Sequence, residues 1–186
     1  MKSILVTGIG GNVAEGVLRN IISILGYDSH ILIVGTDTGE SPAGKIFCDV
    51  FKQVPFAWQD EYEKSIKEIC INHCVDLIIP TTDYETYHLG LIDGLPTLLA
   101  SPVETCKLCL DKYETYKTFS KYGISFAESI LPSDWNYTKD WEGIIVKPRE
   151  GRGSRNIYKN PRDLKSFGDD YIVQPELKGP EITTAF

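Results

Sequence analysis

The sequence lacks any apolar run long enough to cross a membrane and lacks the cysteine pattern of secreted domains. Its longest apolar runs, such as residues 31–34, are far shorter than the roughly 20 residues that a membrane-spanning helix needs. Five cysteines are an odd number without the spacing of a disulfide framework, which predicts free thiols in a reducing cytoplasm. Two pairs at one-turn spacing, Cys70/Cys74 and Cys106/Cys109, also permit a zinc site, with burial on helix faces as the alternative. The N-terminus runs directly into a glycine turn, which predicts a strand and no signal peptide.

A basic excess, the usual sign of nucleic-acid binding, is also missing. The chain has 26 acidic and 19 basic residues and a net charge of −7, so no nucleic-acid partner is expected. Residues 1–100 hold 6 Lys/Arg and 13 Asp/Glu, whereas residues 101–186 hold 13 of each. A cationic cluster in the second half suits a compact anionic ligand better than a long polyanion. It consists of Lys147, Arg149, Arg152 and Arg155, within nine residues.

The first hundred residues alternate between short apolar runs and segments of helical periodicity. Residues 3–7 are β-prone and end at Gly8, and apolar residues then recur with helical spacing over residues 13–25, where Gly26 ends the helix. Strands alternating with helices predict a Rossmann-like parallel sheet with crossover helices. Further strands are expected at 31–34, 75–79 and 97–100, and further helices at 61–72 and 85–92.

The pattern changes after about residue 100. Ser101 and Asp111 both precede predicted helix starts in the manner of a capping residue, and the second of these helices ends at Gly123. We therefore predict one α/β domain over residues 1–105 and an incomplete α+β subdomain over residues 106–186. Its short strands are expected at 126–130, 143–147, 155–159 and 171–174, with one helix near 161–167.

The glycine turn after the first strand resembles the dinucleotide fingerprint of short-chain dehydrogenases. The glycines of residues 7–14 lie at a strand-to-helix turn, and Asp37 lies near the end of the second strand, where an acid could bind a ribose. Tyr113 and Lys117 have the spacing of that family's catalytic pair. The resemblance is incomplete, because Ala14 replaces a glycine and the distance along the chain to Tyr113 is short. An NAD(P)-dependent oxidoreductase is therefore the first alternative function.

A hairpin with a cationic glycine tip carries the clearest functional signal. A predicted strand ends with Lys147, the glycine loop of residues 151–154 follows, and a second strand leaves it. Small residues allow backbone N–H groups to close over phosphate oxygens, and Lys and Arg neutralise their charge. No Gly-Lys-Ser/Thr sequence opens a helix there, so the hairpin is not a Walker loop. A solvated basic hairpin without a ligand is the alternative interpretation.

A strand, a short linker and an acid follow downstream. Gln174, twenty residues after Ser154, ends a predicted strand, and a Pro/Gly linker leads to Glu181. Such a linker exposes backbone donors and acceptors that can bind an adenine edge, and a nearby carboxylate can accept both ribose hydroxyls. Upstream, Lys112 lies at the start of a helix. Together these segments suggest the parts of a nucleotide site.

In their order along the chain, these motifs resemble the ATP-grasp superfamily, and in detail the branch similar to the large subunit of carbamoyl-phosphate synthase. Residues 75–85 are similar to the segment that precedes the ATP lobe in that branch. The resemblance implies an α/β fold with a Rossmann-like pre-ATP-grasp domain, followed by the N-terminal α+β subdomain of an ATP-grasp fold. Lys147 stands where carbamoyl-phosphate synthases commonly carry Arg and amino-acid ligases often carry Lys. The matching segments are 111–112, 121–124, 144–148, 151–154, 172–174 and 179–181.

The resemblance implies an ATP site in the second domain and places candidates for an acceptor site in the first. Two lysines and the glycine loop would contact phosphates, the linker would bind adenine, and the acid would bind ribose. The expected ATP-binding residues are Lys112, Lys147, Gly151, Arg152, Gly153, Ser154, Gln174, Glu176, Leu177 and Glu181. The substrate-binding candidates, at predicted strand ends, are Gly10, Gly11, Asn12, Thr82, Asp83 and Glu85, with helix capping as the alternative role of Asp83.

The reaction implied is ATP-dependent activation of a carboxylate, in which an amine displaces the acyl phosphate. In the family, two Mg²⁺ ions bridge the phosphates and are held by acids on later strands, so we expect no metal ligand and no catalytic residue in this chain. We expect the chain to be the N-terminal part of a cytoplasmic ligase, binding ATP and a small carboxylate or amine substrate and inactive alone. Association as a homodimer through residues 181–186 is also expected. A non-catalytic nucleotide-binding module is the second alternative.

Overall fold

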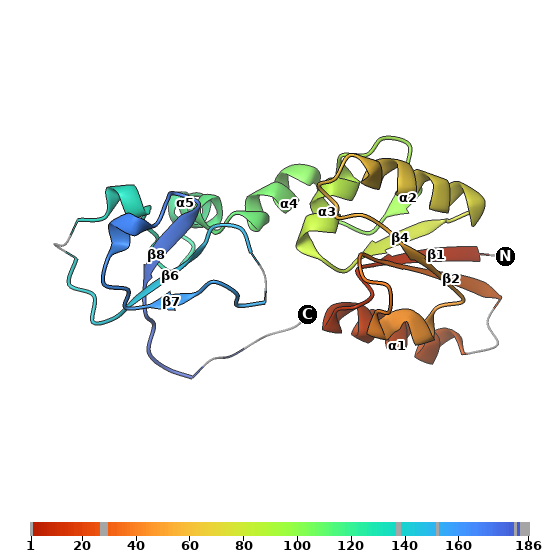
Figure 1. Ribbon diagram of the computed structural model, residues 1–186, viewed down its shortest axis with the longest axis horizontal. Coiled ribbons are helices and arrows are strands. Elements are labelled where there is room, and N and C mark those ends of the chain that lie inside the picture. The colour runs from red at the N-terminus through yellow and green to blue at the C-terminus, as the bar shows by residue number, and fades with distance from the viewer. Residues whose placement is uncertain (1, 27–29, 137–138, 152, 181, 183–186) are drawn as a thin grey trace. The chain divides into compact units, whose positions relative to one another are not determined.

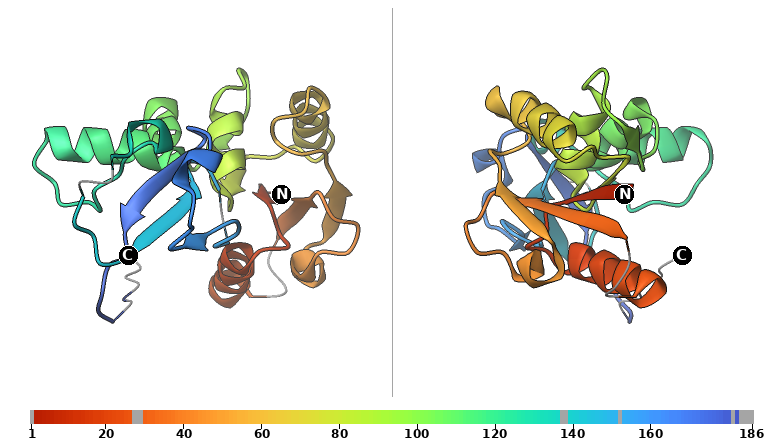
Figure 2. Two further views of the ribbon diagram at one scale, coloured as in Figure 1. Left: turned by 60° about the vertical axis from the view of Figure 1, so that its left-hand side comes forward. Right: turned by 90° about the vertical axis from the view of Figure 1, so that its right-hand side faces the viewer.

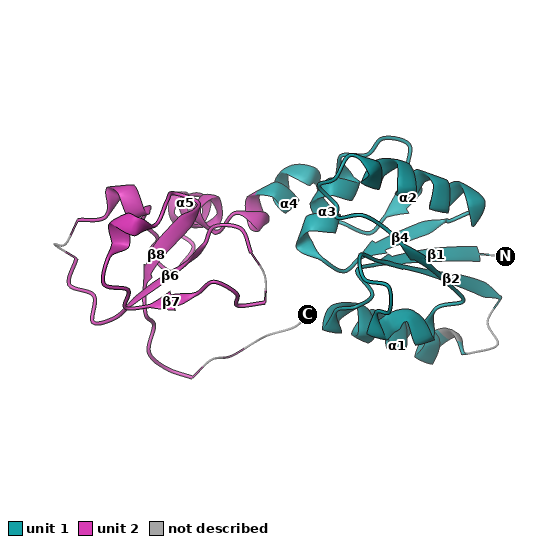
Figure 3. Cartoon of the chain, viewed as in Figure 1, with its two compact units in different colours: residues 1–107 teal, residues 108–186 magenta. Residues whose placement is uncertain are grey.

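The strands of the chain assemble into two sheets, each with its own hydrophobic core (Figure 1). The computed structural model describes residues 2–26, 30–136, 139–151, 153–180 and 182. The first sheet lies in unit 1, residues 1–107, and the second in unit 2, residues 108–186 (Figure 3). Each unit is described by itself below.

Unit 1 is built on a five-stranded sheet in the order β3-β2-β1-β4-β5, in which every neighbouring pair is parallel. The central strand β1 pairs with β2 on one side and β4 on the other, so it is buried along most of its length. This arrangement confirms the predicted Rossmann-like α/β fold. The strands are β1 (Lys2–Thr7), β2 (Ile31–Asp37), β3 (Val50–Gln53), β4 (Leu77–Pro80) and β5 (Thr97–Leu98).

Helices cover both faces of this sheet. Because successive residues of a strand point to opposite faces, neighbouring residues of β1 pack under different helices. Leu5 belongs to the cluster under α2 and α3, whereas Val6 belongs to the cluster under α1. Figure 2 shows α1 and α2 on opposite sides of the strands. The helices of unit 1 are α1 (Asn12–Leu25), α2 (Glu61–Asn72) and α3 (Asp83–Gly90), with a 3₁₀ helix at Ala43–Phe47, and α4 (Val103–Leu110) spans the boundary between the two units.

The turn from β1 into α1 requires a glycine at position 8. Gly8 has φ +68°, in the left-handed region. A Cβ atom there would lie 2.6 Å from Thr82 Cγ2 and 2.7 Å from Glu85 Oε2. The backbone of the turn therefore approaches the start of α3 more closely than any side chain would permit.

Unit 2 has a three-stranded antiparallel sheet in the order β7-β6-β8, with β6 in the centre. The helix α5 (Lys112–Lys121) precedes this sheet in the chain. The core under the sheet contains Trp135, Val146, Leu164 and Val173. The strands are β6 (Ile144–Pro148), β7 (Tyr158–Lys159) and β8 (Tyr171–Pro175).

Three predicted elements of unit 2 differ from the structure. The strand expected at 126–130 is a single antiparallel bridge between Ile130 and Val173. The strand expected at 155–159 is reduced to Tyr158–Lys159, because Asn156 has φ +56°, which an extended strand does not allow. The helix expected near 161–167 is a short 3₁₀ helix at Leu164–Ser166, because the backbone is extended at Asp163, which caps the Lys165 N–H, and again at Phe167.

We predict that Gly8→Ala destabilises the protein more than Gly94→Ala. Gly94 has φ +77° and has open space where a Cβ atom would stand, so both variants carry the same left-handed strain of about 1–2 kcal/mol. Only Gly8→Ala adds the clash with Thr82 and Glu85, worth roughly 1–3 kcal/mol more. Denaturant unfolding measures both losses, and equal losses would show that the turn can move away from α3.

Candidate functional site

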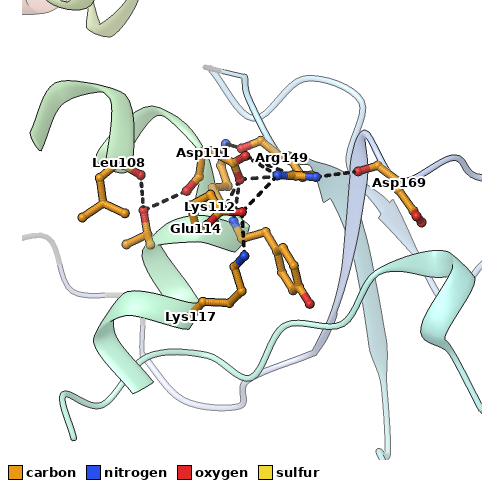
Figure 4. A network of polar contacts seen from close by, with 9 residues as sticks. Leu108, Asp111, Lys112, Glu114, Lys117, Arg149 and Asp169 are labelled. Carbon is orange, nitrogen blue, oxygen red and sulfur yellow. Dashed lines mark hydrogen bonds and ion pairs between the residues drawn. The ribbon is translucent and has the colours of Figure 1, made fainter. Parts of the chain in front are cut away.

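The start of α5 meets the end of β6 at the base of the glycine loop (Figure 4). The Lys112 backbone N–H donates to the Arg149 carbonyl at 3.0 Å. The Lys112 ammonium donates to the same carbonyl at 3.1 Å and to the Gly151 carbonyl at 3.2 Å. Lys112 is therefore held beside the loop that the sequence predicts to cover phosphates.

Arg149 and Asp111 form the closest ion pair in this region (Figure 4). The Arg149 Nε lies 3.2 and 3.1 Å from the two Asp111 carboxylate oxygens, and Nη2 lies 2.5 Å from Oδ2. The Asp111 side chain also caps α5 by accepting the N–H groups of Tyr113 at 2.8 Å and Glu114 at 3.3 Å. This confirms the capping role predicted for Asp111. Asp111 also binds Arg149, which lies 38 residues away in the sequence.

The ion pair keeps both partners charged. Burial by itself would raise the pKa of Asp111, but the Arg149 guanidinium and the two backbone N–H groups lower it below its usual value. Hydrogen bonding to Asp111 raises the pKa of Arg149, against the opposing effect of burial. Side-chain exposures of 15% for Asp111 and 26% for Arg149 place the pair at a partly protected position, where it is screened less than a surface pair.

Lys147, on β6, is the second lysine of the candidate site after Lys112. Burial lowers the pKa of its ammonium, and the positive charge of Lys112 lowers it further. The structure thus brings together two lysines that are 35 positions apart in the sequence. An anion bound here would stabilise the charged form of Lys147, which the positive charge of Lys112 disfavours.

The glycine loop contains two consecutive described residues in the left-handed region. Gly153 has φ +66° and Ser154 has φ +53°, and both are exposed, as is Gly151. Left-handed turns of this kind can turn backbone N–H groups toward an anion. The prediction for Arg152 lies outside the described residues.

The predicted adenine linker is partly engaged in internal contacts. Gln174 is 4% exposed, and its side-chain amide donates to the Ser129 hydroxyl at 2.7 Å. The Glu176 N–H donates to the Gly143 carbonyl at 2.8 Å, and its carboxylate pairs with Lys159 at 2.6 Å. Leu177, by contrast, is 72% exposed. The prediction for Glu181 lies outside the described residues.

In unit 1, the candidate residues lie at the carboxyl edge of the parallel sheet. Asp37 binds the glycine turn there, because its two carboxylate oxygens accept the Gly10 N–H at 2.7 Å and the Gly39 N–H at 2.8 Å. Gly10, Gly11 and Asn12 are exposed beside it. The sequence interpretation of Asp37 as a ribose ligand did not include this role in holding the turn.

The start of α3 corrects the capping role considered for Asp83. Thr82 is the cap, since its hydroxyl oxygen accepts the Glu85 N–H at 3.3 Å. Asp83 is instead exposed in the first helical turn, where a carboxylate interacts favourably with the helix dipole. A threonine in an extended conformation can place its hydroxyl over the helix end, which explains why the cap lies one residue earlier.

Glu85 differs from the other candidates in unit 1 because it is buried, at 8% exposure. The Tyr62 hydroxyl donates to Oε1 at 3.2 Å and the Thr82 hydroxyl donates to Oε2 at 2.9 Å. Burial raises the pKa of Glu85 above its usual value, and the negative charge of Asp37 raises it further. The hydrogen bonds from Thr82 and Tyr62 oppose this rise. Glu85 therefore lies beneath the Gly8 turn rather than facing solvent.

The cysteine pairs considered for zinc do not assemble a metal site. Within the part of the chain that the structure describes, no three His, Cys, Asp or Glu side chains lie together as metal ligands. The five cysteines, all within the described residues, form no disulfide. None of the described helices combines the length and apolar character that crossing a bilayer needs.

The fold is similar to a little under half of each of several solved enzyme structures. An N5-carboxyaminoimidazole synthetase from Staphylococcus aureus, complexed with ADP, superposes with a TM-score of 0.67 at 17% identity, covering 95% of this chain and 47% of that chain. An L-amino acid ligase from Bacillus licheniformis gives 0.68 at 11% identity, covering 97% and 45%. The biotin carboxylase domain of the 2-oxoglutarate carboxylase from Hydrogenobacter thermophilus gives 0.63 at 16% identity, covering 94% and 44%.

These similarities concern the fold. No protein-family model matches the sequence, and no curated protein matches it. The chain spans less than half the length of each of the three structures. A fold-level match does not by itself assign a function, so function is argued from the site.

We predict that Glu85→Gln changes how the stability of the protein depends on pH. The raised pKa of Glu85 in the folded state means that the wild type loses stability as the pH rises from the unfolded-state value, about 4.3, through the folded-state value. Glu85→Gln keeps an oxygen that accepts from one of the Tyr62 and Thr82 hydroxyls and offers an amide N–H to the other, but it cannot ionise. Thermal unfolding across pH 4 to 9 should therefore show the variant gaining stability relative to the wild type as the pH rises, whereas parallel curves would contradict the buried acid.

Proposed function

We propose that this chain is the nucleotide-binding portion of an ATP-grasp carboxylate–amine ligase and that unit 2 binds ATP. The observation that supports the proposal is the position of Lys112, whose ammonium the Arg149 and Gly151 carbonyls hold at the base of the glycine loop, with Lys147 two residues before Arg149 on β6. Two cations beside a loop with left-handed backbone form a site suited to the phosphates of a nucleotide. The match to the N-terminal half of an ADP-bound structure supports this choice of ligand.

The remaining ATP contacts are proposals from the resemblance. We assign phosphate cover to the loop of residues 151–154, adenine binding to residues 174–177, and ribose binding to Glu181. Because the Gln174 amide and the Glu176 N–H are engaged internally, adenine binding would fall to other backbone groups and to the exposed Leu177 side chain. The carboxyl edge of unit 1, with Gly10, Gly11, Asn12, Thr82 and Asp83, is proposed to face the small carboxylate or amine substrate.

The reaction proposed is formation of an acyl phosphate from ATP and a carboxylate, followed by attack of an amine. The chain's own residues would bind and orient the nucleotide and neutralise its phosphates. Magnesium is implied by this reaction class, but the described residues do not supply a cluster of ligands for it, so no step is assigned to it here. Lys147 favours an amino-acid ligase over carbamoyl-phosphate chemistry within the family.

The oxidoreductase alternative is less well supported by the geometry. Both carboxylate oxygens of Asp37 already accept backbone N–H groups, which leaves fewer acceptor positions for a ribose. The Lys117 ammonium pairs with Glu114 at 2.8 Å and lies 5.2 Å from the centre of the Tyr113 ring. Neither arrangement is the one expected for nicotinamide chemistry. A non-catalytic nucleotide-binding module shares the ATP site and differs only in lacking turnover.

We predict that the chain binds ADP and ATP and that Lys147→Gln weakens this binding roughly tenfold to a hundredfold, because one charge-assisted hydrogen bond contributes about 1.5–3 kcal/mol. Lys165→Gln is the matched control, since Lys165 is an exposed lysine of unit 2 in the 3₁₀ helix. Isothermal titration calorimetry measures both. Equal effects of the two variants would mean that only net charge matters.

The same titrations with NADH test the oxidoreductase alternative. The proposal predicts that NADH binds no more tightly than ADP and that Gly11→Ala leaves ADP binding unchanged, because Gly11 belongs to unit 1. If NADH binds more tightly than ADP and Gly11→Ala abolishes that binding, the proposed ATP site is wrong and the glycine turn binds a dinucleotide.

A further inference from the structure

We propose that Arg149 acts as a positioning residue for the nucleotide, and that its pairing with Asp111 fixes Lys112 and Lys147 in register beside the glycine loop. This inference rests on the proposed function, since it concerns the same site. The sequence places Arg149 among four clustered cations that suit an anionic ligand. The contacts of Arg149 point to a different role.

The donors of the Arg149 guanidinium are directed into unit 2 (Figure 4). Nε and Nη2 bind Asp111, and Nη1 donates to the Asp169 carbonyl at 3.2 Å. Nη2 also lies 3.6 Å from the Glu114 carboxylate, and the guanidinium lies over the Tyr113 ring, 5.4 Å from its centre. All three guanidinium nitrogens therefore already have a partner inside unit 2, so a phosphate would have to share Nη1 and Nη2 with Asp169 and Asp111.

The backbone of Arg149 ties three segments together. Its N–H donates to the Asp170 carbonyl at 2.8 Å, which extends the pairing of β6 toward the turn before β8. Its carbonyl accepts both the backbone N–H and the ammonium of Lys112. The position of the Lys112 ammonium therefore depends directly on where Arg149 is held, and Asp111 holds it.

The charges lead to the same assignment. Asp111 neutralises Arg149, so the positive charge offered to a ligand at the base of the glycine loop comes from Lys112 and Lys147. If Arg149 were itself a phosphate ligand, Asp111 would compete with the phosphate, and removing the Asp111 charge would strengthen nucleotide binding. If Arg149 positions the lysines, removing that charge would weaken binding. The two roles therefore predict opposite changes in nucleotide affinity when the Asp111 charge is removed.

The pairing requires arginine rather than any cation. Arg149 contacts both Asp111 oxygens and the Asp169 carbonyl at once, which the planar fork of a guanidinium permits and a lysine ammonium does not. Arg149→Lys thus keeps the charge and removes the geometry. Asp111→Asn removes the charge and keeps the cap of α5, because Asn is among the best capping residues.

The test is calorimetric titration of the chain with ADP, using the wild type, Arg149→Lys, Asp111→Asn and the double variant. We expect each single variant to weaken ADP binding about tenfold, and the double variant to be no weaker than either single one, since both remove the same interaction. Arg162→Lys is the matched control, because Arg162 is an exposed arginine of unit 2 outside the ATP-binding residues, and it should bind ADP as the wild type does.

A second measurement separates positioning from general stability. Lys147 has a lowered pKa partly because Lys112 is near it. Releasing Lys112 should therefore raise the pKa of Lys147 toward the usual value in Arg149→Lys and Asp111→Asn, but not in Arg162→Lys. Competitive acetylation of lysine side chains as a function of pH, quantified by mass spectrometry without any nucleotide, measures this shift.

The outcomes distinguish the inference from the proposed function. If the wild type binds no ADP, the proposed nucleotide site is wrong and the role of Arg149 falls with it. If the wild type binds ADP and both single variants bind equally well, only the positioning role is overturned. Stronger ADP binding by Asp111→Asn would show that Arg149 is itself a phosphate ligand. Should Arg149→Lys fail to fold, Asp111→Asn, which retains the cap of α5, still shows whether ADP binding becomes weaker or stronger.

Discussion

The ion pair of Asp111 and Arg149 joins two residues that lie 38 positions apart, and much of the candidate site depends on it. Asp111 caps α5, and Arg149 follows the strand β6 that carries Lys147. Without the pair, the start of α5 and the end of β6 would be joined by the hydrogen bonds of Lys112 and by the weaker contacts of Arg149 with Glu114 and the Tyr113 ring. Partial burial increases the strength of the pair, because solvent screens it less than an exposed one.

Four strands of the parallel sheet of unit 1 could be predicted because they are short apolar runs separated by helical periodicity and glycine stops, whereas β3, which ends in Lys52 and Gln53, was not predicted. The antiparallel sheet of unit 2 was predicted less accurately, for reasons that lie in single residues. The left-handed backbone at Asn156 and Asn160 shortens β7, and an asparagine in a sequence does not by itself indicate that conformation. Residues 126–130 contribute only one bridge, through Ile130, so their apolar character serves packing more than pairing.

Local features of the site were also readable from the sequence, whereas its long-range contacts were not. The cap at Asp111 follows from a pattern within four residues, and it was predicted. The partners of Arg149, Gln174 and Glu85 lie 38, 45 and 23 residues from them, and no spacing rule reveals such pairs. For this reason the sequence assigns Arg149 to an anionic ligand, while the structure assigns its guanidinium to Asp111.

Where a nucleotide binds on this chain is the central question, and residue-resolved NMR answers it most directly. The measurement is a ¹H–¹⁵N titration of the chain with ADP, followed at assigned backbone amides. The account predicts that the largest shifts occur in unit 2, at Lys112, at Lys147 and along residues 151–154. Shifts confined to the glycine turn of unit 1, at residues 8–12, would contradict it and place the nucleotide on the parallel sheet instead.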